Sequence, residues 1–170
     1  MKKLSLILAL FFIVACQPKV EEGLDHAARM SKLYDAFAEG DMETVLGSLA
    51  EDIEWSEAES FIYDYGEPLV GKDAVVEGVF AKLGEEWEYW NLEDKSFHNV
   101  GTDGVLVTGR YRAKNKATGK LLDAQFAHVW KLRDTLAMVF QQYTDTKQAA
   151  EVVYMDDDEG DVEESEETTN

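Results

Sequence analysis

The chain has 170 residues, with 35 acidic and 16 basic side chains and a formal net charge of −19 at pH 7. This acidic balance argues against a nucleic-acid-binding protein, whose contacts to phosphate groups need a basic surface. It also argues against attachment to anionic lipid through a polybasic patch.

The first residues have the features of an export signal. Lys2 and Lys3 precede a largely apolar run at positions 4–15. That run is too short to cross a bilayer, because a spanning helix needs about 20 apolar residues. A short apolar run after a basic start is typical of a secretory signal peptide. We therefore predict a signal peptide at residues 1–15 and an exported protein.

The end of this run resembles the bacterial lipobox, in which aliphatic and small residues precede a cysteine. The four residues are Ile13-Val14-Ala15-Cys16. The resemblance implies cleavage before Cys16, a lipid on its sulfur and acylation of the new amino terminus, with residues 16–24 as a tether. Several acyl chains together hold a protein firmly on a membrane. Gln17 is not the Asp that retains such proteins in the inner membrane, so an outer membrane is expected if the host has two.

Helical spacing of apolar residues predicts three helices in the first half of the domain. The first ends at Gly40, and Asp41 caps a short second one. A short strand around Ile53 and Trp55 follows, and the third helix ends at Gly84. The apolar positions that define the three helices are Ala27, Met30, Leu33, Tyr34 and Phe37, then Val45, Leu46 and Leu49, and then Val75, Val76, Val79, Phe80 and Leu83.

The second half reads as strands, because apolar and polar residues alternate there. The first of these strands contains Val105 and Tyr111, and turns are expected at residues 115–119 and 134–135. The last strand is expected to run through Tyr143 to Asp145. The middle strand places four residues on one face: Phe126, His128, Trp130 and Leu132.

This order of elements predicts one α+β domain at residues 25–150, in which three helices close one side of a curved antiparallel sheet. Beyond it, nine of the twelve residues at positions 156–167 are acidic. Such a segment cannot bury enough apolar surface to offset the entropy lost on ordering. We therefore predict a disordered acidic tail at residues 151–170.

Several runs, in the same order, resemble the nuclear transport factor 2-like cone fold, and within it the ketosteroid-isomerase-related, SnoaL-like polyketide cyclase group. The resemblance covers most of residues 25–146 and implies a cone-shaped sheet packed against three N-terminal helices. The runs that carry it are Gly40-Asp41, Leu49-Ala50-Glu51-Asp52-Ile53-Glu54-Trp55, Gly71-Lys72-Asp73-Ala74-Val75 before Phe80, His128-Val129-Trp130 and Gln142-Tyr143-Thr144-Asp145.

The resemblance also implies two catalytic positions. The general-base carboxylate of the ketosteroid isomerases falls on Glu57, and their oxyanion-binding acid falls on His128. Their tyrosine on the first helix falls on Leu33, with Tyr34 beside it. The SnoaL-like relatives use the same cone with different polar groups, which suits this chain better than steroid isomerisation.

Each of these residues also has a purely structural interpretation. Glu57 is either one more solvated acid in an acidic stretch or a desolvated base at the mouth of an apolar cone. His128 is either a buried histidine held by a neighbour or a donor to a substrate carbonyl. Tyr143 and Asp145 form either a hydrogen bond at the rim or a second acid–base group. Aromatic residues mostly build cores, but in a cone several of them line a pocket for a flat or hydrophobic ligand. The predicted pocket residues are Tyr34, Trp55, Tyr111, Phe126, Trp130, Tyr143 and Asp145.

No metal and no cofactor are expected. His26, His98 and His128 are scattered without ligand spacing, and no phosphate-binding glycine loop is present. Cys16 is the only cysteine, so neither a disulfide nor a cysteine nucleophile is expected.

The sequence thus predicts a lipid-anchored domain with an apolar pocket for a small hydrophobic or aromatic molecule. If it is an enzyme, proton abstraction next to a carbonyl would give isomerisation or cyclisation, with Glu57 as the base and His128 as the polarising group. One alternative is a binding protein that holds a hydrophobic ligand without chemistry. Another is an interaction module whose open sheet face pairs in a homodimer and whose acidic tail binds a cationic partner.

Overall fold

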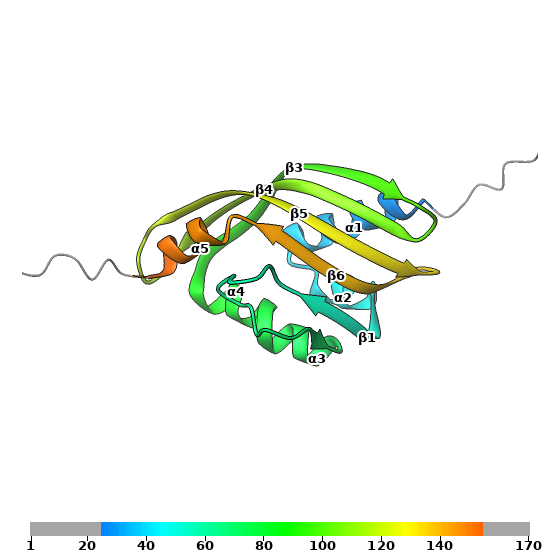
Figure 1. Cartoon of the computed structure of the whole chain (residues 1–170), viewed down its shortest axis with the longest axis horizontal. Coiled ribbons are helices and arrows are strands. Elements are labelled where there is room, and N and C mark those ends of the chain that lie inside the picture. The colour runs from blue at the N-terminus through cyan, green and yellow to red at the C-terminus, as the bar shows by residue number, and fades with distance from the viewer. Residues whose placement is uncertain (1–24, 155–170) are drawn as a thin grey trace, which may run out of the picture.

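The computed structural model describes residues 25–154, which form one curved six-stranded sheet with helices against it (Figure 1). The strand order is β2-β1-β6-β5-β4-β3. Only β1 and β6 run parallel, and the other neighbours are antiparallel. The predicted α+β class and cone-like sheet are confirmed. The strands are β1 (Leu49–Ser56), β2 (Leu69–Val70), β3 (Trp87–Val100), β4 (Gly104–Asn115), β5 (Leu121–Arg133) and β6 (Leu136–Thr144).

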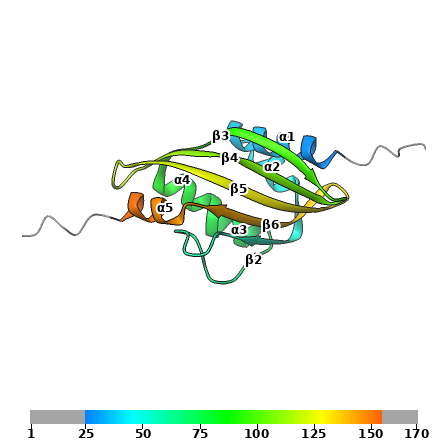
Figure 2. The ribbon, with the colours of Figure 1, turned by 45° about the horizontal axis from the view of Figure 1, so that its top comes forward.

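All the helices except α5 close the sheet on its inner side. The first helix contacts β3 and β4, and the run from α3 to α4 lies against β1 and the start of β3. The last helix, α5, packs against β5 at one end of the sheet (Figure 2). The helical segments are α1 (His26–Glu39), α2 (Met42–Gly47), α3 (Lys72–Val75), the π-helical turn η1 (Val76–Phe80), α4 (Ala81–Glu86) and α5 (Thr146–Val153).

The first helix ends at Gly40 and Asp41 caps the second, as predicted, but α2 ends at Gly47, and Leu49, predicted within it, begins β1. Asp25 precedes α1, and its side chain accepts a hydrogen bond from the backbone N–H of Ala28. Gly40 ends α1 with φ of 74°, a left-handed conformation that glycine adopts without a steric penalty. Asp41 caps α2 by accepting from the N–H of Thr44, as the residue pattern indicated.

The third predicted helix is present, but it is not a regular α-helix and it continues to Glu86. Its middle is the π turn η1. Gly78 lies within this turn, and a Cβ there would come within 2.7 Å of the Leu69 Cδ1 atom. The Tyr65 hydroxyl donates to the Gly78 carbonyl at 3.1 Å. Hydrophobic spacing does not distinguish a π turn from an α turn, since both keep the same residues facing the core.

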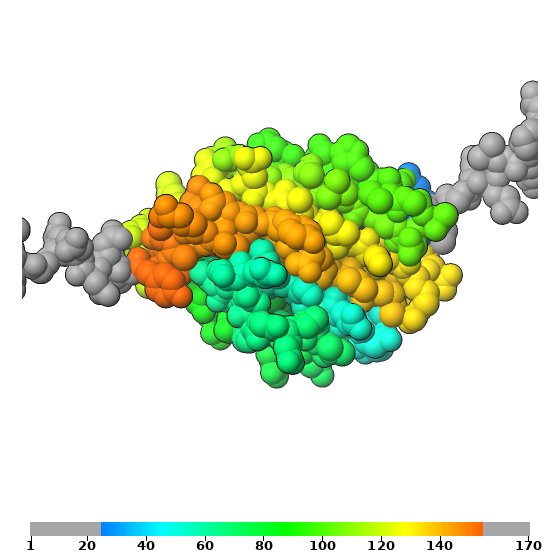
Figure 3. All heavy atoms as spheres, viewed as in Figure 1, coloured from blue at the N-terminus to red at the C-terminus, as the bar shows by residue number. Residues whose placement is uncertain are grey.

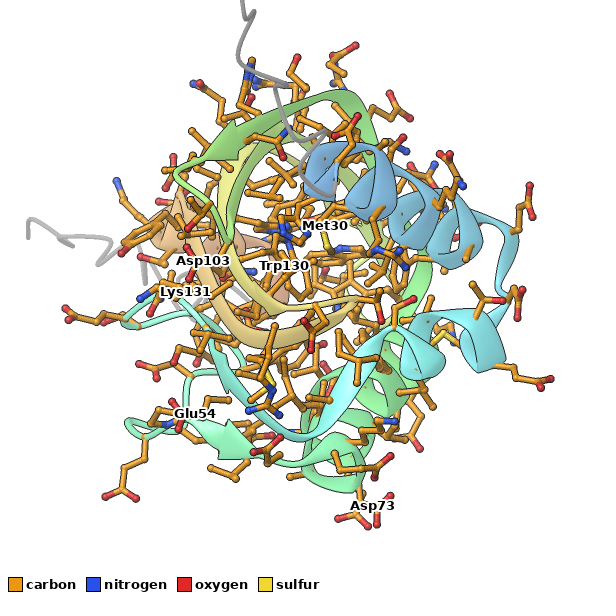
Figure 4. The ribbon with its side chains drawn as sticks, turned by 90° about the vertical axis from the view of Figure 1, so that its right-hand side faces the viewer. Met30, Glu54, Asp73, Asp103, Trp130 and Lys131 are labelled. Carbon is orange, nitrogen blue, oxygen red and sulfur yellow. The ribbon has the colours of Figure 1, made fainter. Side chains whose placement is uncertain are left out.

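The inner face of β5 is the one that the alternation predicted, with all four predicted residues buried. Figure 4 shows Trp130 and Met30 inside the space that the sheet and α1 enclose, whereas Glu54 and Asp73 lie at the periphery. Gly109 on β4 allows this packing, because a Cβ there would lie 2.6 Å from the ring of Phe126.

Three elements were not predicted from the sequence: the two-residue strand β2, strand β3 and helix α5. Strand β3 is long but mostly exposed, and its pairing with β4 is interrupted by register shifts, so a regular two-residue alternation is missing. The helix α5 replaces the predicted end of the last strand, because β6 ends at Thr144 and Asp145 caps α5 by accepting from the N–H of Gln148. Residues 151–153 therefore belong to a helix, and the predicted tail boundary was too early.

The predicted signal peptide, Cys16, the tether and the rest of the acidic tail lie outside the described residues. Within residues 25–154, no helix is both long and apolar enough to cross a membrane.

Candidate functional site

The inner face of the sheet and the helices enclose a cavity of about 60 Å³ that is partly open to solvent. Its walls are mainly apolar and aromatic, as is usual for pockets that bind small organic molecules. The polar residues among them are Tyr34, Glu57, Tyr63, Tyr111, His128 and Gln142.

Apart from Glu57, the lining residues that keep partial exposure are Phe37 of α1, Phe80 of η1, Leu83 of α4, and Trp90 and Leu92 of β3, so the cavity comes close to the surface where these elements meet. Phe37 of α1 and Phe80 of η1 face one another there, with ring centroids 6.0 Å apart. Leu83, Trp90 and Leu92 complete this apolar edge. A ligand that enters between these elements meets no charged side chain among the lining residues before it reaches Glu57.

Glu57 and His128, far apart in the sequence, line the same cavity, as predicted. Four of the predicted pocket residues line it with them: Tyr34, Trp55, Tyr111 and Trp130.

Three predicted pocket residues lie elsewhere. Phe126 is buried, but it lies behind His128 and stacks on its ring at 4.2 Å between centroids. Tyr143 is on the opposite face of β6 and is 57% exposed, because the two-residue period of the strand turns Gln142 inward instead. Asp145 is exposed and caps α5. The prediction that the last strand runs through Tyr143 to Asp145 was wrong, since β6 ends at Thr144.

The carboxyl group of Glu57 is buried and only half satisfied. It follows β1, and its Oε1 atom accepts a hydrogen bond from the indole N–H of Trp55 at 2.7 Å. Its Oε2 atom is buried without a partner among residues 25–154. Burial raises the pKa of Glu57 to about 7, and the negative charge of Asp64 adds to this, while the Trp55 hydrogen bond opposes it. The interpretation of Glu57 as a solvated surface acid therefore does not hold.

His128 lies in the middle of β5 between two tyrosine hydroxyls. Its Nδ1 atom is 2.5 Å from the Tyr34 hydroxyl, and its Nε2 atom is 2.6 Å from the Tyr111 hydroxyl. Burial lowers the pKa of His128 to about 3, so the imidazole is neutral at physiological pH. Because both ring nitrogens are occupied, His128 presents no free N–H to the cavity. The predicted direct contact between His128 and a ligand carbonyl is therefore not available in this arrangement.

Each of the two tyrosine hydroxyls also accepts a hydrogen bond from a further side chain. The indole N–H of Trp130 donates to the Tyr34 hydroxyl at 3.0 Å. The side-chain amide of Gln142 donates to the Tyr111 hydroxyl at 2.9 Å and accepts from the backbone N–H of Ala58 at 3.3 Å. Figure 3 shows the segment after β1, which includes Ala58, packed against β6 and the end of the sheet.

Gln142 is the lining residue of most consequence that the sequence analysis did not select. Its alternation with the buried Phe140 on β6 was the available signal, because a polar residue at an inward strand position needs a partner. Tyr63 was also not selected. It donates to Glu86 at 2.7 Å and accepts from the indole of Trp87 at 2.8 Å, which ties the segment after β1 to the end of α4.

Within residues 25–154 no group of three or more His, Cys, Asp or Glu side chains converges in a way that could hold a metal ion.

Comparison with known proteins places this geometry in a family. The sequence matches the family model described as the SnoaL-like domain over residues 30–139. No curated protein matches the chain.

Several solved structures are similar. One is an NTF2-like protein from Burkholderia thailandensis E264, with 29% identity, a TM-score of 0.70, and coverage of 76% of this chain and 97% of that one. Another is TerC co-crystallised with polyporic acid, with 25% identity, a TM-score of 0.65, and coverage of 74% and 95%. A candidate polyketide cyclase from Silicibacter sp. TM1040 has 17% identity, a TM-score of 0.65, and coverage of 75% and 94%, so it shows likeness of fold alone.

The family match covers most of the described residues, and the strand order and the enclosed cavity agree with it. The chain belongs to the SnoaL-like domain family and has the nuclear transport factor 2-like fold.

Proposed function

We propose that the protein binds a small hydrophobic carbonyl compound in its cavity and transfers a proton at the carbon next to the carbonyl, without a cofactor. One observation carries the proposal, which is the half-satisfied carboxyl group of Glu57 in an apolar cavity. A carboxylate with a pKa near 7 is a stronger base than an ordinary carboxylate and is still ionised in part at neutral pH.

In this proposal Glu57 removes the proton from the carbon next to the carbonyl, and the electron pair of the C–H bond moves toward the carbonyl oxygen to give an enolate. A hydrogen-bond donor in the cluster of Tyr34, His128 and Tyr111 stabilises the negative oxygen as it forms. Return of the proton to another carbon completes an isomerisation. Attack of the enolate carbon on a second carbonyl of the same molecule forms an alkoxide, and transfer of the proton from Glu57 to that oxygen completes a cyclisation.

The relatives support a small organic ligand. TerC, which is 25% identical over 74% of this chain, was crystallised with polyporic acid. The apolar entrance at Phe37 and Phe80 also suits a hydrophobic molecule better than a charged one.

A test of the chemistry does not require the natural substrate. 1-Indanone is a small flat ketone with two exchangeable hydrogens beside its carbonyl, and their replacement by deuterium in D₂O can be followed by NMR. Wild-type protein should accelerate this exchange, and the rate should rise with pH up to about 7, as Glu57 ionises. Glu57→Gln keeps the shape but removes the base, so the exchange should fall by about 100-fold or more.

The matched control is Glu59→Gln, because Glu59 is a neighbouring but exposed acid and its replacement should leave the exchange rate unchanged. If wild type and Glu57→Gln exchange at the same rate while both bind the ketone, the protein is a binding protein without this chemistry. That outcome is the alternative function, which the mainly apolar walls of the cavity would serve equally well.

We also propose that the domain is exported and held on a membrane by lipid on Cys16, the outer membrane where the host has two. The support is the lipobox-like run that ends in Cys16. Cys16→Ser should block lipidation and leave uncleaved precursor. Mass spectrometry that finds wild-type protein cleaved before residue 16 but without acyl chains would contradict this proposal.

The open face of the sheet is proposed as the contact of a homodimer. It exposes Val129 at 38% and Tyr143 at 57% on neighbouring strands. Light scattering should give twice the monomer mass, and Val129→Lys should return it to the monomer mass. A monomeric wild type would contradict the proposal.

A further inference from the structure

The hydrogen atoms in the cluster around His128 can be counted, because several of their positions are fixed. The indole N–H of Trp130 can only donate, so the Tyr34 oxygen accepts it. The Gln142 side chain must turn its oxygen toward the N–H of Ala58, so its NH₂ group donates to the Tyr111 oxygen. Each of the two tyrosine hydroxyl oxygens therefore already accepts one hydrogen bond from a residue other than His128.

A neutral imidazole carries one N–H and one bare nitrogen, so the two tyrosines cannot bind His128 in the same way. If the hydrogen is on Nδ1, His128 donates to Tyr34 and accepts from Tyr111. If it is on Nε2, His128 donates to Tyr111 and accepts from Tyr34. In either case one tyrosine hydroxyl only accepts within the cluster, and its own hydrogen has no partner among the described residues. Both tyrosines line the cavity.

We propose that the tyrosine with the unused hydrogen is Tyr111, and that it donates this hydrogen to the ligand oxygen while His128 carries its hydrogen on Nε2. The inference rests on the proposed function in one respect, which is that the ligand carries a carbonyl oxygen that can accept a hydrogen bond. It does not require that the protein catalyses a reaction. Tyr111 is then the residue that touches the ligand, and His128 and Gln142 are positioning residues.

The choice of Tyr111 over Tyr34 follows from its link, through Gln142, to the segment that carries Glu57. The amide of Gln142 binds both the Tyr111 hydroxyl and the N–H of Ala58, the residue that follows Glu57. The same side chain thus holds the Tyr111 hydroxyl and the segment that carries the base at one end of the cavity. The unpartnered Oε2 atom of Glu57 attracts the hydrogen of a donor group to this end of the cavity.

The charges agree with this placement. Burial raises the pKa of Tyr111, and the negative charge of Glu57 raises it further. For Tyr34 burial alone raises the pKa, and the Trp130 hydrogen bond opposes it. Glu57 therefore raises the pKa of Tyr111 and contributes no shift to the pKa of Tyr34. Because the Tyr111 hydroxyl is a weak acid here, it stabilises an enolate by a hydrogen bond and keeps its proton.

This arrangement defines how a ligand would lie. Its carbonyl oxygen would meet Tyr111, and the carbon beside the carbonyl would meet Glu57, so that one flat molecule spans both groups. The apolar remainder would point toward Phe37 and Phe80 at the entrance.

The first test is made on the unmodified protein and does not depend on a variant that folds. Two-dimensional ¹H–¹⁵N NMR of the imidazole rings distinguishes a protonated from a bare ring nitrogen. The signals of His128 can be assigned by elimination with His26→Gln and His98→Gln. We expect the hydrogen of His128 on Nε2 at pH 7. A hydrogen on Nδ1 would overturn the assignment, because Tyr34 would then hold the unused hydrogen.

The second test uses 1-indanone and the matched pair Tyr111→Phe and Tyr34→Phe, each of which removes one hydroxyl group. The infrared carbonyl stretch of the bound ketone should move to lower frequency in wild type and in Tyr34→Phe, but not in Tyr111→Phe. The affinity should fall about tenfold in Tyr111→Phe, as expected for one lost hydrogen bond, and less than threefold in Tyr34→Phe.

Equal losses in the two variants, or no binding of the ketone to wild type, would overturn the proposal. Failure of the proposed catalysis gives a different result. In that case wild type shows the shifted carbonyl stretch, and Tyr111→Phe abolishes it, although the deuterium exchange is no faster than in buffer.

Discussion

Glu57 and His128 lie in the same cavity, where the His128 side chain and the Oε2 atom of Glu57 are buried, but their surroundings differ. His128 has a partner at each ring nitrogen, and each partner is itself held by a further donor. Glu57 has one partner for two oxygens. Burial disfavours the charged form of both groups, so it lowers the pKa of the histidine to about 3 and raises that of the glutamate to about 7.

The difference is between a fully hydrogen-bonded polar group and one that has an unpaired oxygen. A buried polar group with every bond satisfied stabilises one arrangement of its neighbours. A buried group with an unused oxygen reduces stability, and such groups gather where a protein binds or transforms a ligand. In the proposed function, His128 therefore positions the two tyrosines, and Glu57 is the group that reacts.

The largest effect that this comparison predicts is a dependence of the free energy of unfolding on pH. Between pH 4.5 and 7 the Glu57 carboxyl is protonated in the folded protein and ionised in the unfolded chain. The folded state then binds more protons, so this group makes stability fall as pH rises through that window. His128 acts in the opposite direction, because its stabilising effect is lost as pH falls from about 6.5 toward 3.

Glu57→Gln isolates the glutamate, because His128 is the same in both proteins. The free energy of unfolding of the variant, relative to wild type, should increase by about 3 kcal/mol between pH 4 and pH 8. Urea unfolding at a series of pH values measures this difference. Glu59→Gln should give a difference that does not change over the same range. A flat curve for Glu57→Gln would mean that the carboxyl is hydrated in solution.

The comparison also predicts the cost of removing His128. His128→Leu keeps a similar volume but leaves Tyr34 and Tyr111 with one partner each, so it should lower the free energy of unfolding by about 2 kcal/mol. His98→Leu is the matched control, because His98 is exposed on β3 and its replacement should have an effect within about 0.5 kcal/mol. Equal effects in the two variants would show that the hydrogen-bonded cluster does not stabilise the fold.

The inner positions of the site could be predicted from the sequence because strand alternation determines them. Phe126, His128 and Trp130 face inward for that reason. The position of Glu57 came from a resemblance to related enzymes, and the structure places it in the same cavity as His128. Backbone direction and a two-residue period are enough to decide which side of a sheet a residue occupies.

The hydrogen-bond partners within the cavity could not be predicted in the same way. Tyr34, Tyr111 and Gln142 come from α1, β4 and β6, and only their spatial arrangement shows that they form one chain through His128. Strand β3 was missed for a related reason, since register shifts leave it without a regular alternation. The π turn η1 was missed because its apolar residues fall at the spacing of an α-helix.

The smallest predicted effect concerns Asp145, which was expected in the site but caps α5. Its carboxylate accepts from the N–H of Gln148 at 3.0 Å, so Asp145→Ala should lower the free energy of unfolding by about 1 kcal/mol. Asp41→Ala is the matched control, because Asp41 caps α2 through the same contact to Thr44 at 3.1 Å. Both variants should bind 1-indanone and exchange its hydrogens as wild type does, since neither residue lines the cavity. A loss of exchange in Asp145→Ala alone, with stability unchanged, would instead return Asp145 to the site as an acid–base group.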